Sequence, residues 1–180
     1  MDMLSIVEST ILANTARLVP LRRCGMQSVD YRTVPWSLLR LYSRKTRSGE
    51  YHCIDSSYVK SIYGRDCVGR NPTDRGRRAT KVSAIVNHDG VPMSLVAFPA
   101  NTSDYKTVDN TLLQSVRPTP ISCPMYADKG YDSKQVRATF RAAGYIDRVS
   151  KRRFVTHRVV NRRRIVVERF FSWLGSVSKL

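Results

Sequence analysis

The sequence predicts an α/β domain in which helices flank a mixed β-sheet, with a short helical extension in front. Two observations predict it. Three short strand-like segments, two of them joined by a hairpin signal, come first, and segments with helical and strand periodicity then alternate. A chain of 180 residues, 42% of them hydrophobic, is long enough for one such domain with its own core.

The beginning of the chain has the character of a helical extension. Apolar residues recur at helical spacing over residues 1–20, and a second helical stretch is expected from Val34 to Arg44. The segment Ser43–Gly49 is basic and polar, as a linker would be. We therefore divide the chain into an extension of residues 1–49 and a core of residues 50–180.

The core is expected to begin with three antiparallel strands. His52–Asp55 is predicted to be a short strand, Thr80–Asn87 alternates as a strand does, and Pro92–Phe98 is its returning partner. The dipeptide Asp89-Gly90 between the last two is a hairpin turn signal. Tyr63–Arg78 is rich in Gly, Arg, Pro and Asp without a period, and we interpret it as a mobile basic loop.

Helices and strands alternate after the hairpin. Ser103 or Asp104 is placed to cap a helix that carries Val108, Leu112 and Val116 at helical spacing. The later elements are a strand Ser122–Ala127, a helix from Ser133 to Gly144, a strand Tyr145–Val149, a basic loop Lys151–Arg158 and a helix from about Val159 to Val177. Three antiparallel strands followed by alternating helix and strand is the element order of a ribonuclease H-like fold.

A formal net charge of +17 is the strongest compositional signal. So many unbalanced Lys and Arg side chains repel one another in a compact domain, and a polyanionic partner relieves that repulsion. Nucleic acid is the expected partner. A ribosomal-type or merely soluble basic protein is the alternative that charge alone leaves open.

The cysteines point to a reducing compartment. Cys24, Cys53, Cys67 and Cys123 include no Cys-x-x-Cys pair, and the histidines complete no zinc pattern. Met3–Val19 is too short and too charged to span a bilayer and is no clear signal peptide. We expect an intracellular protein without a membrane partner, cytoplasmic in a prokaryote or nuclear in a eukaryotic or viral setting.

Two carboxylates are expected where strands end. Asp55 ends the first strand and Asp128 follows Ser122–Ala127, and ligands of open α/β sheets bind beyond the carboxyl ends of strands. Glu168 interrupts an apolar face of the last helix and needs a partner, either Arg164 one turn earlier or a divalent metal shared with the aspartates. Taken singly, each acid also fits a turn, a strand end or a solvated helix edge.

Three carboxylates on separate elements suit the cleavage of phosphodiester bonds. That reaction needs charge neutralised on the attacking and the leaving oxygen. Two divalent cations about 4 Å apart do this, and oxygen ligands suit Mg²⁺. We therefore expect two Mg²⁺ or Mn²⁺ ions at these acids.

Each acid lies within a longer motif. The motifs are Ile54–Val59, Ala127–Asp132 and Arg164–Phe171, with Thr80–Val82 and Pro99–Asp104 between them. In this order they resemble the Asp-Ser, Ala-Asp-Lys-Gly-Tyr-Asp and Arg-x-x-x-Glu-Arg blocks of insertion-sequence DDE transposases, of the compact insertion-sequence four/five type with a ribonuclease H-like core. The two segments between them fall where that family has a strand and a helix start.

The resemblance implies a DNA transposase. Asp55, Asp128 and Glu168 would be its catalytic, metal-binding carboxylates, used for metal-dependent DNA cleavage and strand transfer. Its partners would be the DNA of the element ends and of the target, bound by a homodimer. Tyr31–Val34 and Trp36 resemble, faintly, the family's DNA-binding region, so residues 1–49 would be its remnant.

The departures from the family support two alternatives. Relatives carry Tyr where this chain has Asn161, and Lys where it has Gly175; that Lys helps to hold donor DNA. The chain ends at Leu180, soon after the third motif, so a shortened core is expected. The alternatives are an inactive or domesticated relative that binds DNA, and a nuclease or resolvase on the same fold.

Basic residues gather before the central hairpin and before Glu168, where they would hold DNA phosphates. A solvated charge run is the alternative for these clusters. For Tyr131 and Trp173, packing is favoured over stacking on bases. The expected DNA-binding residues are Arg75, Arg77, Arg78, Lys81, Lys129, Arg152, Arg153, Arg162, Arg163 and Arg164.

Overall fold

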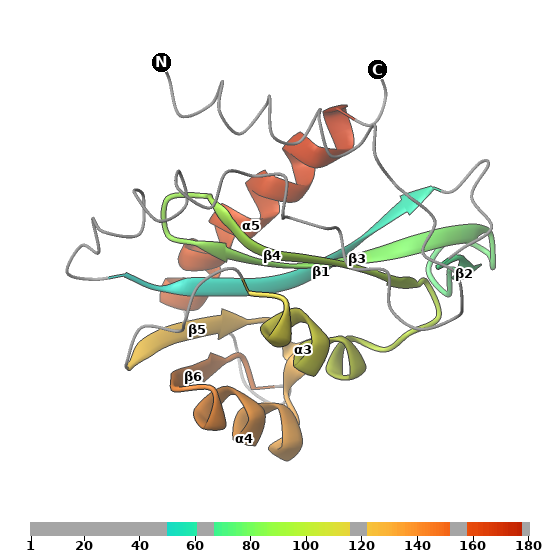
Figure 1. Cartoon of the computed structure of the whole chain (residues 1–180). Helices are drawn as coiled ribbons and strands as arrows, with labels where there is room; N and C mark the ends of the chain where they lie inside the picture. Colours follow the sequence, from blue (N-terminus) through green and yellow to red (C-terminus); the bar gives the residue numbers. More distant parts are fainter. Residues whose placement is uncertain (1–49, 61–66, 116–121, 152–157, 178–180) are drawn as a thin grey trace.

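The computed structural model describes residues 50–60, 67–115, 122–151 and 158–177, which form one mixed β-sheet with helices on both faces (Figure 1). The expected extension lies outside these residues. The elements are β1 (His52–Lys60), β2 (Gly69–Arg70), β3 (Arg78–Asn87), β4 (Pro92–Pro99), α3 (Asp104–Leu113), β5 (Cys123–Ala127), the 3-10 turn η2 (Lys129–Tyr131), α4 (Lys134–Ala142), β6 (Tyr145–Val149) and α5 (Arg158–Val177).

The sheet places β1 at its centre. On one side β1 pairs with β3 and β3 with β4, both antiparallel, and the short β2 also pairs with β3. On the other side β5 runs parallel to β1, and β6 parallel to β5. Helix α5 covers one face, and α3 and α4 cover the other (Figure 1). This is the arrangement of a ribonuclease H-like α/β fold, which confirms the predicted fold class.

β1 is longer than the sequence analysis expected. The prediction that Asp55 ends its strand is wrong, because β1 stays paired with β3 as far as Lys60, which lies opposite Ala79. The pairing with β5 is short and joins His52 to Met125 and Cys53 to Tyr126. Since the offset is constant in a parallel pair, the same register continued by two residues would set Asp128 beside Asp55.

The described part of the expected mobile loop is a compact turn between β2 and β3. The buried Asn71 organises it: its backbone N–H donates to Arg77 O at 2.8 Å, and its own carbonyl accepts the N–H of Gly76 at 3.0 Å. The Asn71 side chain also accepts the backbone N–H and the hydroxyl of Thr73. Residue propensities alone could not predict this ordered turn, because Asn71 closes it through both its backbone and its side-chain amide oxygen.

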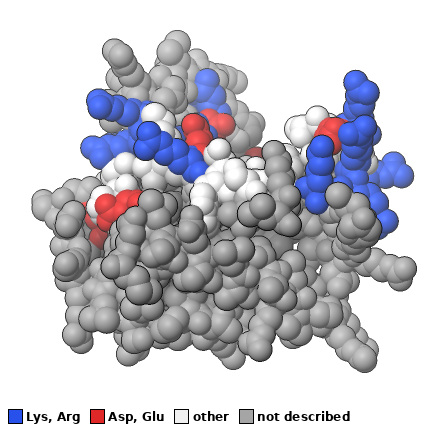
Figure 2. All heavy atoms as spheres, turned by 90° about the horizontal axis from the view of Figure 1, so that it is seen from above, with Lys and Arg blue, Asp and Glu red and all other residues white. Residues whose placement is uncertain are grey.

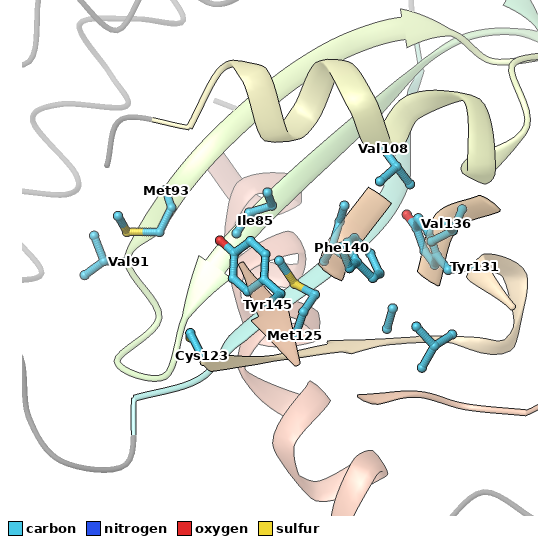
Figure 3. Packing of buried hydrophobic residues seen from close by; sticks show 13 residues of the cluster. Ile85, Val91, Met93, Val108, Cys123, Met125, Tyr131, Val136, Phe140 and Tyr145 are labelled. Carbon is cyan, nitrogen blue, oxygen red and sulfur yellow. The ribbon is translucent and has the colours of Figure 1, made fainter. Parts of the chain in front are cut away.

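The larger core cluster lies between the sheet and helices α3 and α4 (Figure 3). Val108 of α3 and Phe140 of α4 are fully buried with Ile85 and Met125 of the sheet. Burying one such side chain contributes about 1.5–3 kcal/mol. This layer fixes β5 and α4, and with them the turn between the two.

Two predicted helix boundaries are confirmed. Ser133 caps α4 by accepting the N–H of Val136 at 3.1 Å, and Gly144 follows the helix with a positive φ of 85°. Helix α3 ends at Leu113, and the expected helical residue Val116 lies outside the described residues. None of the helices described is long and apolar enough to cross a membrane.

Candidate active site

Asp55 lies in β1 with its side chain on the α5 face of the sheet. Strand side chains alternate between faces, and the two residues before it pack on opposite sides, Cys53 with α5 and Ile54 with the α3 and α4 layer. The carboxylate accepts the Ser56 N–H at 2.8 Å and Arg164 Nη2 at 3.0 Å. Burial raises the pKa of Asp55 above its usual value, in spite of these hydrogen bonds.

Asp128 follows β5 directly and precedes η2. The Tyr131 N–H donates to Asp128 O at 3.0 Å, and the Tyr131 ring is buried, as the sequence analysis expected of it. The turn is therefore anchored in the core, while the Asp128 side chain stays 46% exposed. Its Oδ1 accepts Arg164 Nη1 at 3.2 Å.

Glu168 lies at the edge of the packed face of α5. Its neighbour Val167 and the nearby Phe170 are buried against β1 and β3, whereas the Glu168 side chain is 56% exposed. Its Oε1 lies 3.8 Å from Nη2 of Arg164, one helical turn earlier. Packing of α5 on the sheet thus brings a third acid to the same point.

Arg164 joins the three acids. Its side chain is 12% exposed, and its two terminal nitrogens contact Asp55, Asp128 and Glu168 from β1, the end of β5 and α5. Burial would lower the pKa of Arg164, but the charges of the acids outweigh burial and raise it above its usual value. Of the two partners that the sequence analysis left open for Glu168, Arg164 lies within 3.8 Å of it, and the metal stays a prediction.

The chemistry of the donor set fits a hard divalent cation, because all three acids offer carboxylate oxygens, the ligands that Mg²⁺ and Mn²⁺ prefer. Their spacing, however, is that of side chains gathered around a guanidinium. Among the described residues, no three His, Cys, Asp or Glu side chains are arranged to hold a metal ion. The ligand types therefore suit a metal, while the present geometry suits Arg164.

Comparison with known proteins agrees with this constellation. Residues 52–179 match the family described as the transposase DDE domain. A Burkholderia cepacia protein named "Putative transposase for insertion sequence element IS402" is 31% identical over 182 residues, 94% of this chain and 81% of that protein. The chain belongs to the transposase DDE domain family. This confirms the resemblance of the three motifs and gives the chain a role in DNA transposition.

Behind the acids, on the α3 face of the sheet, this transposase domain has a polar network that the sequence analysis did not assign. Asp104 Oδ1 accepts the hydroxyl of Ser56 at 2.7 Å and the amine of Lys81 at 2.8 Å. Ser56 directly follows Asp55, so the network ties the backbone at the first acid to the start of α3. The available signal was the position of Lys81 in β3, where it alternates with the apolar Val82 and Ala84.

Lys81 differs from the expectation of a DNA-binding cation. Its side chain is buried, and its amine also donates to Thr102 O at 2.6 Å and lies 5.1 Å from the ring centre of Tyr58. An amine held in this way does not reach a phosphate on the surface. The run of basic residues before it concealed this, because β3 begins at Arg78 and turns Lys81 toward α3.

On the face seen in Figure 2, exposed basic side chains of the transposase domain gather in two groups. Figure 2 shows one group over α5 and the other over the turn between β2 and β3, with acidic side chains beside both. In α5 the exposed cations are Arg162, Arg163 and Arg169, and at the turn they are Arg70, Arg75, Arg77 and Arg78. Arg70 and Arg169 were not among the predicted DNA-binding residues, because each stands apart from the main basic runs.

The other expected DNA-binding residues are placed differently. Lys129 is partly exposed in η2, and Arg164 lies among the acids. Arg163 stacks its guanidinium over the Tyr51 ring at 4.5 Å, which holds this cation against the sheet. Arg152 and Arg153 lie outside the described residues.

Proposed function

We propose that this transposase is active: it nicks DNA at the ends of a mobile element and transfers the freed 3′ hydroxyl to target DNA in a reaction that depends on Mg²⁺ or Mn²⁺. One observation carries the proposal. Three carboxylates from separate elements, Asp55, Asp128 and Glu168, meet at one cation within 3.8 Å. Their order along the chain is that of the family's motifs.

The proposed roles follow from the position of each acid. Asp55 and Asp128 would hold one metal ion together, and Glu168 would complete the site of a second. Such a pair of ions would neutralise charge on the attacking and the leaving oxygen of a phosphodiester. Burial around Asp55 keeps water away from one side of the site, which strengthens its electrostatic interactions.

The basic groups would hold the DNA backbone on both sides of the acids. Arg70 lies directly opposite Arg78 in the β2–β3 pair, and both are exposed. Like charges that face each other across two strands are unfavourable, and a phosphate between them removes that repulsion. We propose Arg162 and Arg163 of α5 for the same role, and a homodimer as the DNA-bound form.

The test is a nicking assay with the purified full chain on supercoiled plasmid carrying the element ends. We expect nicking with Mg²⁺ or Mn²⁺, no nicking in EDTA, and a loss of at least about 10³-fold in Asp55→Asn, because one metal ligand and its charge are removed. Asp109→Asn is the matched control: this acid is exposed on α3 and should leave nicking unchanged. Cleavage by Asp55→Asn at the wild-type rate contradicts the proposal.

A relative that binds DNA without cutting it is the second candidate. The observation that favours it is Gly175, which stands where the family carries a Lys for donor DNA. Salt-sensitive DNA binding without metal-dependent nicking by the wild type would select this function. A strand-transfer assay with pre-cut ends separates the transposase from a nuclease or resolvase, which cleaves and does not join.

A further inference from the structure

Among the residues that the structure describes, the polar contacts of the Arg164 guanidinium are with the three acids. Nη2 contacts Asp55 and Glu168, and Nη1 contacts Asp128. The third nitrogen, Nε, is buried and has no hydrogen-bond partner within the part of the chain that the structure describes. The polar contacts that the described residues make with this guanidinium therefore come from the three carboxylates.

Charge explains why Arg164 lies there. Three carboxylates so close together repel one another, and their negative charge is offset in place by this one guanidinium. The acids are spaced around its planar fork, and in that spacing they are not arranged to hold a metal ion. A divalent cation that bound the same oxygens would have to take them from Arg164.

We infer that Arg164 is an internal cation that holds the acids apart in the metal-free protein and is exchanged for the metal when the site is loaded. The inference rests on the proposed metal site and adds a positioning residue to it. Arg164 competes with the metal for the same oxygens. It therefore sets the metal affinity, and its removal makes metal binding tighter. If Arg164 only supported the fold or the metal site, its removal would leave metal binding equal or make it weaker.

Binding of Mn²⁺ to the DNA-free full chain, measured by calorimetry and by the electron paramagnetic resonance of free Mn²⁺, tests this. Arg164→Gln should bind Mn²⁺ on the order of tenfold more tightly than the wild type, because a positive charge about 3–4 Å from the ligands is gone. Asp55→Asn should bind it more weakly. Arg148→Gln is the matched control, since it removes the same charge from an exposed position of β6 and should leave the Mn²⁺ affinity unchanged.

Arg164→Lys covers the case in which Arg164→Gln does not fold. Lys keeps the charge but offers one nitrogen in place of a fork, so its Mn²⁺ affinity should be higher than that of the wild type. Equal or weaker Mn²⁺ binding by the folded Arg164 variants, beside measurable binding by the wild type, overturns the exchange and leaves the metal site standing. No Mn²⁺ binding by either protein overturns both the exchange and the metal site.

Discussion

Lys81 and Asp104 form an ion pair of 2.8 Å on the face of the sheet opposite Arg164 and its acids. The Lys81 side chain is 4% exposed and that of Asp104 34%, so the pair is buried at the Lys end and open at the Asp end. Ser56 shares the same carboxylate oxygen, which links the pair to the strand that carries Asp55.

Removal of the Lys81 amine should destabilise the fold. Lys81→Met leaves Asp104 without its cation and should lower the free energy of unfolding by about 2 kcal/mol, less than for a fully buried pair. Urea unfolding measures this, and a double-mutant cycle with Asp104→Asn should show coupling. Lys106→Met, at an exposed cation of α3, is the control and should change nothing. If Lys81→Met weakened DNA binding without changing the free energy of unfolding, Lys81 would be a DNA-binding residue, as the sequence analysis expected.

The basic turn should contribute to DNA affinity in proportion to its charge. Arg77→Ala/Arg78→Ala should weaken DNA binding about tenfold near 0.1 M salt and lower the slope of log affinity against log salt by about 2, one for each phosphate that the variant no longer neutralises. Fluorescence anisotropy over a salt series measures both. Lys134→Ala/Arg148→Ala removes two exposed cations from α4 and β6 and should leave the slope unchanged. An equal change of the slope in both double variants would mean that DNA affinity depends on the net charge of the protein and not on the position of the basic turn.

The ion-pair network of α4 and β6 should make stability depend on pH. Partial burial raises the pKa of Asp147, but hydrogen bonds from Arg137 and Arg141 outweigh it and hold this pKa below its usual value. The stabilisation is therefore complete above about pH 4, the unfolded value, and is lost as the pH falls through the folded pKa.

Arg137→Ala should accordingly lower the free energy of unfolding by about 2 kcal/mol at pH 7 and by clearly less at pH 3. Arg137 also donates a hydrogen bond to Asp132 of the second motif at 2.8 Å. Part of the loss of stability in Arg137→Ala therefore remains at low pH, as long as the Asp132 carboxylate is ionised. Denaturant unfolding at the two pH values measures the difference, with Arg148→Ala of β6 as the control. An equal loss of unfolding free energy at pH 3 and pH 7 would show that the pairing of Arg137 with Asp147 does not cause the pH dependence.

Gly175 should accept a Lys without steric strain. A Cβ at this position of α5 would meet no atom of the described residues within 4 Å. Both Gly175→Ala and Gly175→Lys should stabilise the helix, by about 1 kcal/mol or somewhat less, because Gly is a poor helix former. Only the Lys variant should also bind element-end DNA more tightly, which a competition binding assay measures. If both variants bind DNA alike, position 175 does not face the DNA.

Local pattern was enough for most elements, while contacts between distant segments were not predictable. β6 and α5 lie where periodicity places them, and Ser133 caps α4 as its position indicates. The strand after Asp55 could not be predicted, because its polar residues are held by pairing with β3 and not by their own propensity. Arg164 was predictable as a partner of Glu168 one turn away, but not of the two aspartates.

The pairing of β1 with β5 positions the aspartates through the backbone, separately from the exposed basic groups. Continued by two residues, the register of these strands would set the first two acids side by side. The turn between β2 and β3 and the outer side of α5 lie outside that pairing. Substitutions among the basic side chains that we propose to hold DNA should therefore change DNA affinity without disturbing the strand pairing that carries the first two acids.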